Sequence, residues 1–242
     1  PPAAPYRSRP ARPDPPAGPR CAGAPAVELG AHGDVVVVGP GQRGWFHEEV
    51  GGRIWRVSAR SFFQAGPAGA EAVVSAVDRA TAGAVGPGGL LVDAYAGVGV
   101  IGGVVAGRRR CRLIAVEASA EAVADARVNL ADLDATVVRG PVARWSPPPG
   151  ARPDVVVADP ARPGLGRPGV AALASAGAPR LVLVSCDPAS LGRDVVLLAG
   201  AGYLLVTVEV VDIFPGTPHV ETVSTFRRRA GGLADRRRPT VG

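Results

Sequence analysis

The 242-residue chain is long enough for one large domain, or for one domain with part of another, and 47% of its residues are hydrophobic, enough for a sizeable core. Its net charge of +6 is concentrated at the ends, because residues 1–26 carry +3 and residues 227–242 carry +5, which leaves −2 for residues 27–226. Basic ends of this kind fit either nucleic-acid binding or a solvated tail. No apolar run reaches the roughly 18–20 residues of a membrane span, so we expect no membrane association.

The three cysteines, Cys21, Cys111 and Cys186, are widely spaced and form no Cys-x-x-Cys pair. We therefore expect no metal and no iron–sulfur cluster within this chain. The odd number and the low density of cysteines indicate a reducing compartment. Because the first 20 residues also lack the apolar segment of a signal peptide, the expected location is the cytoplasm.

The chain begins with a Pro- and Arg-rich segment, residues 1–26, that we expect to be disordered. Residues 27–66 are predicted to form a short β-rich region, with strands at Val35–Val38 and Arg53–Val57, and we interpret it as the remnant of an upstream region. From Ala68 to Gly83 the apolar residues recur at helical spacing, which predicts a helix.

Strands and helices alternate after this helix. The strands are almost entirely apolar, which is typical of a parallel sheet covered on both faces. Two strands without a helix between them close the pattern and predict an antiparallel C-terminal edge. We therefore expect an α/β fold with a mostly parallel seven-stranded sheet over residues 67–226, followed by an Arg-rich tail at residues 227–242. The predicted strands are Leu90–Ala94, Arg112–Val116, Thr136–Arg139, Asp154–Ala158, Leu181–Ser185, Tyr203–Val211 and Val220–Phe226, with helices over Ala120–Leu130 and from Pro188 to Ala199.

A glycine-rich turn follows the first strand of this alternation. It runs Asp93-Ala-Tyr-Ala-Gly97-Val-Gly99-Val-Ile-Gly102, a G-x-G-x-x-G pattern, and Glu117 ends the next strand. Glycines let the backbone approach a ligand, and a carboxylate on the second strand can bind ribose hydroxyls, so the pattern predicts a nicotinamide dinucleotide or S-adenosylmethionine (SAM). A turn that only packs the helix on the strand is the structural alternative. Asp93 at the strand end would repel a pyrophosphate but can accept hydrogen bonds from the ammonium group of SAM, which favours SAM.

Three reactive side chains are predicted at the ends of other strands. Asp159 follows a buried strand and should face the same crevice as the glycine turn, because parallel α/β sheets bind ligands at the carboxyl ends of their strands. Cys186 precedes a helix that we expect to begin with Asp187 as capping carboxylate and Pro188 in the first turn. The N-terminal end of this helix is expected to lower the pKa of the thiol, whereas the neighbouring Asp187 is expected to raise it. Glu221 enters an apolar strand, where desolvation should raise its pKa and make it a better base. The structural alternatives are a capping Asp, a buried cysteine and a surface Glu.

A thiolate and a base in a site for a methyl donor suit the methylation of uracil at carbon 5. That carbon is too weak a nucleophile until a thiolate adds at carbon 6, and a base must later remove the carbon 5 proton so that the thiolate can leave. Two further side chains have open roles: Arg162 can bind a phosphate or pair with an acid, and His219 can cap its loop or carry a proton.

These motifs together resemble the RNA 5-methyluridine (uracil-C5) methyltransferase family, SAM-dependent class I (Rossmann-like) enzymes that act on uridines of tRNA and 23S rRNA. Ala161 and Asp187 replace a Pro and an Asn of the family's motifs. The matching stretches follow the family's order: Ser61-Phe62-Phe63-Gln64, the Asp93–Gly102 turn, Val116-Glu117, Asp159-Pro160 with Arg162, Val184-Ser185-Cys186-Asp187-Pro188 with Leu191 and Arg193-Asp194, and Phe214-Pro215 with Thr217 and His219-Val220-Glu221-Thr222.

The resemblance implies a SAM-dependent methyltransferase that acts on rRNA or tRNA as a monomer, with Cys186 as nucleophile and Glu221 as base. It places Arg162, Phe214 and His219 against the substrate. The residues assigned to SAM are Gln64, Asp93, Tyr95, Gly97, Gly99, Glu117 and Asp159.

Two other functions remain open from the residues alone. A catalytically inactive RNA-binding protein would keep the fold and bind SAM without turnover. A nicotinamide oxidoreductase would use the glycine turn but would leave Cys186 and Glu221 without roles.

Overall fold

The computed structural model describes residues 26–28, 35–37, 44–59, 61–63, 66–213 and 220–229. The predicted disordered segment at residues 1–26 lies almost entirely outside these ranges, as does most of the predicted tail. The last strand nevertheless continues to Arg228, two residues into that predicted tail, because Arg227 pairs with Arg180 of the neighbouring strand.

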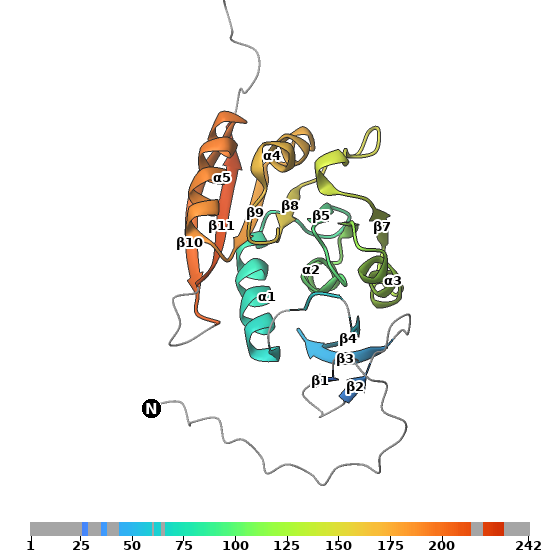
Figure 1. Ribbon diagram of the computed structural model, residues 1–242. Helices are drawn as coiled ribbons and strands as arrows, with labels where there is room; N and C mark the ends of the chain where they lie inside the picture. Colours follow the sequence, from blue (N-terminus) through green and yellow to red (C-terminus); the bar gives the residue numbers. More distant parts are fainter. Residues whose placement is uncertain are drawn as a thin grey trace, which may run out of the picture.

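Seven strands form one sheet in the order β10-β11-β9-β8-β5-β6-β7 (Figure 1). The five strands from β5 to β9 are parallel to one another, and β11 is antiparallel to both β9 and β10. The predicted mostly parallel seven-stranded sheet with an antiparallel C-terminal edge is therefore confirmed. The strands are β5 (Leu90–Ala94), β6 (Arg112–Glu117), β7 (Ala135–Arg139), β8 (Val155–Ala158), β9 (Arg180–Ser185), β10 (Tyr203–Val211) and β11 (Glu221–Arg228).

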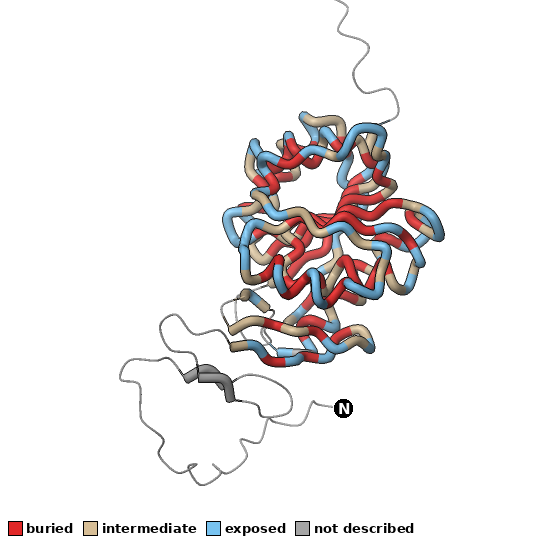
Figure 2. The backbone as a smooth tube through the Cα atoms, turned by 90° about the vertical axis from the view of Figure 1, so that its right-hand side faces the viewer, coloured by how far each residue is buried: buried red, intermediate tan, exposed pale blue. Residues whose placement is uncertain are grey.

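Helices cover both faces of the sheet, and the buried strands run through the middle (Figure 2). Since successive side chains of a strand point to opposite faces, each strand contributes to two cores. In β9, Val182 and Val184 pack with the helices on one face, and Leu181 and Leu183 pack with those on the other. The first face carries α1 (Pro67–Thr81), α2 (Val100–Arg109) and α3 (Ala120–Asn129), and the second carries η1 (Val142–Arg144), α4 (Gly166–Ser175) and α5 (Pro188–Gly200).

Helix α4 was not predicted, because its first turn contains Gly166, Pro168 and Gly169, which are poor helix formers. The structure stabilises this turn from outside the segment. The carboxylate of Asp194, on α5, accepts hydrogen bonds from the backbone N–H groups of Leu165 (2.6 Å) and Gly166 (3.1 Å). A side chain 28 residues away thus satisfies N–H groups that a helix leaves free at its start.

The N-terminal part forms two hairpins in the stretch predicted to be β-rich. Strands β1 (Ala26–Glu28) and β2 (Val35–Val37) pair with each other, and β3 (Trp45–Val50), which was not predicted, pairs with β4 (Arg53–Ser58). The turn between β3 and β4 consists of Gly51 and Gly52, both with positive φ, as a tight two-residue hairpin turn requires.

The β3–β4 hairpin packs on the α/β domain through one face. Trp55 of β4 is fully buried, and its indole N–H donates to the carbonyl of Val50 at 2.9 Å. Gly103 of α2 makes room for this ring, because a Cβ at that position would lie 2.6 Å from it. The hairpin is thereby an integral part of the domain surface.

Candidate active site

A cavity of about 730 Å³ opens at the carboxyl ends of β5, β6, β8 and β9. This is the edge at which parallel α/β sheets bind their ligands. Eight of the predicted site residues line it: Asp93, Tyr95, Gly97, Glu117, Asp159, Arg162, Cys186 and Glu221. Gly99 begins α2 beside the cavity, and the predictions for Gln64, Phe214 and His219 lie outside the described residues.

The side chain of Asp93 is buried behind the glycine turn, and only 1% of the residue's surface is exposed. Its Oδ2 accepts a hydrogen bond from the backbone N–H of Gly102 at 2.8 Å, whereas its Oδ1 has no hydrogen-bond partner among the described residues. Burial raises the pKa of this carboxyl to about 7, against the lowering effect of the Gly102 N–H. Gly102 is required for this packing, because a Cβ there would lie 2.6 Å from Oδ2.

Glu117 ties the end of β6 to the glycine turn. One carboxylate oxygen accepts from the backbone N–H of Gly97 at 2.9 Å, and the other accepts from that of Ser119 at 2.7 Å. A carboxylate has about four acceptor sites, so these two bonds orient the group and leave lone pairs for a ligand. Tyr95 in the same turn has a left-handed φ of 66°, which costs about 1–3 kcal/mol for a residue other than glycine and occurs at functional sites.

Cys186 and Glu221 meet at the other end of the cavity. Thr222 of β11 pairs with Ser185 of β9, and its hydroxyl donates to the Ser185 carbonyl at 3.0 Å. Because the two strands are antiparallel, the residue that follows Ser185 and the residue that precedes Thr222 lie at the same edge of the sheet. The cysteine and the glutamate are therefore brought together by sheet register across 35 residues of chain.

Burial controls the acidity of both groups. It raises the pKa of the Glu221 carboxyl to about 7, with Asp159 as the second cause, in the direction predicted for a carboxylate on an apolar strand. Burial also raises the pKa of the Cys186 thiol, followed by the charges of Glu221 and Asp159, while Arg162 lowers it. The expectation that the helix end would lower the thiol pKa is therefore wrong, because desolvation and the nearby carboxylates outweigh it.

Asp187 is the capping residue that was predicted at the start of α5. Its carboxylate caps α5, with Oδ1 accepting from the backbone N–H of Ser190 at 2.8 Å, and Oδ2 lies 3.7 Å from Nε of Arg162. The Ser190 N–H lowers the pKa of the Asp187 carboxyl. Burial and Glu221, rather than Asp187, are the main causes of the raised thiol pKa.

One wall of the cavity is apolar and was not anticipated. Val73 and Val74 of α1 and Ile101 of α2 line it, together with Phe62 and Phe63 of the segment that leads from β4 to α1. Valines at helical spacing indicate a core-facing helix, and nothing in such a pattern distinguishes a core face from a cavity wall. The polar end of such a site is therefore easier to predict from sequence than its apolar wall.

Two further features are absent from the described part of the chain. No group of three or more His, Cys, Asp or Glu side chains there is placed to hold a metal ion. No helix in the same ranges is both long and apolar enough to cross a bilayer.

Comparisons with known proteins agree with this geometry. No protein-family model matches the chain. It is 35% identical over 221 residues to an uncharacterized RNA methyltransferase of Streptomyces coelicolor, covering 86% of this chain and 48% of the relative. A relative of the same description from Clostridium tetani is 35% identical over 190 residues, covering 77% and 41%. The chain thus spans about half the length of the curated relatives it matches.

Solved structures define the class of the fold. A Pyrococcus abyssi tRNA (uracil-54, C5)-methyltransferase in complex with S-adenosyl-L-homocysteine superposes with a TM-score of 0.65 and 28% identity, over 75% of this chain and 44% of that one. A magnesium protoporphyrin IX methyltransferase from Synechocystis with bound SAM has a TM-score of 0.53 and 18% identity, over 67% and 81%. The fold of this chain is that of the class I SAM-dependent methyltransferases. Since the second enzyme acts on a porphyrin, the fold alone does not choose the substrate.

Proposed function

We propose that this chain catalyses the SAM-dependent methylation of uracil at carbon 5 in RNA. The observation that carries the proposal is that Cys186 and Glu221 share one cavity with Asp93 and Glu117, on a class I methyltransferase fold. The 28% identity to a tRNA uracil-C5 methyltransferase and the relatives described as RNA methyltransferases support the same reaction.

The donor end of the cavity fits SAM. Its volume lies within the roughly 300–1,000 Å³ of small-molecule sites. Oδ1 of Asp93, buried and without a partner among the described residues, matches the ammonium group of SAM in charge. The oriented carboxylate of Glu117 can accept hydrogen bonds from two ribose hydroxyls. When bound, SAM supplies the electrophilic methyl group.

The reacting end of the cavity activates the uracil. The Cys186 thiol first loses its proton to solvent, which leaves Glu221, with a pKa of about 7, available as a carboxylate for the later step. The thiolate then forms a bond to carbon 6 of uracil, and the electron pair of the C5=C6 double bond moves toward carbon 5 and the O4 oxygen. Carbon 5 thereby becomes nucleophilic enough to take the methyl group of SAM, whose bond to the sulfonium sulfur would break to leave S-adenosylhomocysteine.

Release of the product needs a base at the same position. Glu221, in its carboxylate form, removes the proton from the methylated carbon 5. The electron pair of that C–H bond re-forms the C5=C6 double bond, the C6–S bond breaks, and Cys186 leaves as a thiolate. A carboxyl group with a pKa raised to about 7 is a stronger base than an ordinary glutamate, which suits this step.

The test uses in vitro transcripts of tRNA and 23S rRNA that carry tritium at carbon 5 of uracil. With SAM, the wild-type chain should release tritium, and Cys186→Ala should release none while it still binds SAM. Cys111→Ala, at a buried cysteine outside the cavity, is the matched control and should retain release. Release that survives Cys186→Ala would sink the mechanism. SAM binding with no release from either RNA would favour the inactive RNA-binding alternative.

A further inference from the structure

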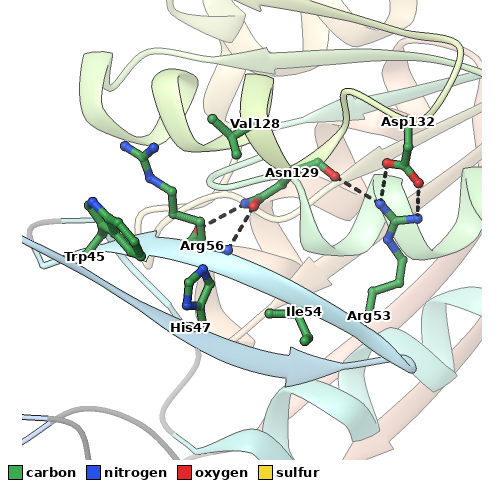
Figure 3. A pocket seen from close by; sticks show the side chains of 8 residues that line it. All are labelled: Trp45, His47, Arg53, Ile54, Arg56, Val128, Asn129 and Asp132. Atoms are coloured by element: carbon green, nitrogen blue, oxygen red, sulfur yellow. Dashed lines mark hydrogen bonds and ion pairs between the residues drawn. The ribbon is translucent and has the colours of Figure 1, made fainter.

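A second hollow, of about 420 Å³, lies outside the active-site cavity, between the β3–β4 hairpin and the end of α3 (Figure 3). The hairpin supplies an aromatic ring, an imidazole and two guanidinium groups, and α3 with the turn after it closes the other side. The residues that line this hairpin groove are Trp45, His47, Arg53, Ile54, Arg56, Val128, Asn129 and Asp132.

One end of the hairpin groove is formed by an exposed tryptophan (Figure 3). Trp45 is 49% exposed, whereas Trp55 and Trp145 are buried, at 0% and 9%. The His47 ring stands edge-on to Trp45 at a centroid distance of 5.0 Å, and the Arg56 guanidinium lies 5.4 Å from the Trp45 centroid. The two partners hold a large apolar ring in one orientation at the surface.

The groove is held rigidly before any ligand arrives. Nε of Arg56 lies 2.9 Å from the fully buried carboxylate of Asp125. Asn129 of α3 accepts from the backbone N–H of Arg56 at 2.8 Å and donates to its carbonyl at 2.9 Å. At the far end, Arg53 makes two hydrogen bonds to Asp132, at 2.9 and 2.7 Å. A binding surface organised in advance loses little conformational entropy on association.

The chemistry of the groove suits a nucleotide. A flat ring flanked by a guanidinium group offers stacking and cation–π contact to a nucleobase. Each of the two arginines is paired with an aspartate, so the groove carries no net charge and its contact with RNA rests on stacking. Ile54 of the hairpin and Val128 of α3, exposed at 70% and 53%, add apolar surface to the lining.

A short stretch of chain links the hairpin groove to the active-site cavity. Trp45 pairs with Ser58, the last residue of β4, whose backbone N–H donates to Asp125 at 2.7 Å. A few residues further on, Phe62 and Phe63 line the cavity that holds Cys186. An RNA strand whose uridine enters the cavity can therefore continue over the open face of the hairpin.

We propose that the hairpin groove binds a nucleobase of single-stranded RNA next to the target uridine, with Trp45 as the stacking platform. This rests on the proposed function for the identity of the strand, but the contact itself can be measured without turnover. Trp45 is the exposed one of the chain's three tryptophans, so its fluorescence reports directly on stacking.

The experiment titrates the full chain with a short oligouridine and follows tryptophan fluorescence. RNA should quench the wild-type signal, and Trp45→Phe, which keeps the two buried tryptophans, should lose most of that quenching. Trp45→Ala should weaken RNA binding about 5- to 100-fold and raise the KM for RNA by a similar factor. Because the lost contact carries no charge, the salt dependence of binding should not change. Val210→Ala, at an exposed valine on β10, is the matched control.

The outcomes separate the two proposals. Tritium release that is equal in wild type and Trp45→Ala, with no quenching by RNA, overturns the groove and leaves the proposed function standing. Quenching that depends on Trp45 without any tritium release keeps the groove and overturns the proposed function. A changed salt dependence in Trp45→Ala would contradict stacking as the mode of contact.

Discussion

The two ends of the active-site cavity are built on different principles. At the donor end, on β5 and β6, the carboxylates of Asp93 and Glu117 accept hydrogen bonds from backbone N–H groups of the glycine turn and its neighbours. At the reacting end, on β9 and β11, the half-buried Cys186 lies near the buried Glu221, and both have raised pKa values. The donor end is thus organised to hold hydrogen-bond acceptors in fixed positions, and the reacting end is organised to exchange protons and bonds.

The largest expected effect comes from removing the base at the reacting end. Glu221→Gln should lower kcat for tritium release by about 10²- to 10⁴-fold, because the amide cannot accept the carbon 5 proton. The blocked elimination should also leave RNA covalently attached to Cys186, visible as a denaturant-stable complex on a gel. The control is Glu209→Gln, at a partly exposed glutamate on β10. If Glu221→Gln turns over at the wild-type rate, Glu221 is not the base, and the contrast between the donor end and the reacting end fails.

A smaller effect is expected at the donor end. Glu117→Ala removes a carboxylate that orients the turn and can bind ribose, so SAM should bind about 10- to 100-fold more weakly, the range for hydrogen bonds to a charged group. Calorimetric titration with SAM measures this. At saturating SAM the rate should recover most of the wild-type value. A loss of kcat that SAM cannot restore would mean that Glu117 also acts in the reaction.

The pH dependence should follow the base. At saturating SAM, kcat/KM for RNA should fall about tenfold per pH unit below pH 7, because the Glu221 carboxyl is protonated there and a protonated acid cannot remove a proton. In Glu221→Gln the residual rate should lack this inflection. An unchanged inflection in that variant would assign the titration to another group.

The smallest effect concerns stability. The pKa of Asp93 is raised to about 7 in the folded state from an ordinary value of 3.8, so its contribution is fully present below pH 4 and is lost as the pH rises through 7. The slope is at most about 1.4 kcal/mol per pH unit. Asp93→Asn should therefore raise the melting temperature above pH 7 while weakening SAM binding. Asp134→Asn, at an exposed position, serves as the control and should show neither change.

Much of the fold follows from local sequence patterns. Leu90–Ala94 and Tyr203–Val211 were predicted with the bounds that the structure shows, because apolar, β-branched runs between turn residues have few alternatives. Helix α4 and strand β3 were not predicted, because each departs from the usual residue pattern of its element. The first turn of α4 consists of poor helix formers capped by the distant Asp194, and β3 contains a buried Glu48 within its alternation.

The candidate site was likewise predictable only in part. Strand ends placed Asp93, Glu117, Asp159 and Cys186 at one edge of the sheet, since the carboxyl ends of parallel strands must coincide. The acidity of the thiol was not predictable from its neighbours in sequence, because Glu221, 35 residues away, contributes more to it than the adjacent Asp187.

The sequence by itself determined the strand–helix alternation, the glycine turn and the set of reactive side chains, because these depend on spacing of a few residues. Only the tertiary structure decided what those side chains do to one another. It made Gly102 a packing partner of Asp93 and Trp45 the exposed ring of a groove. Burial and electrostatic interaction depend on distance in space, and the chain fixes those distances only when its distant segments pack together.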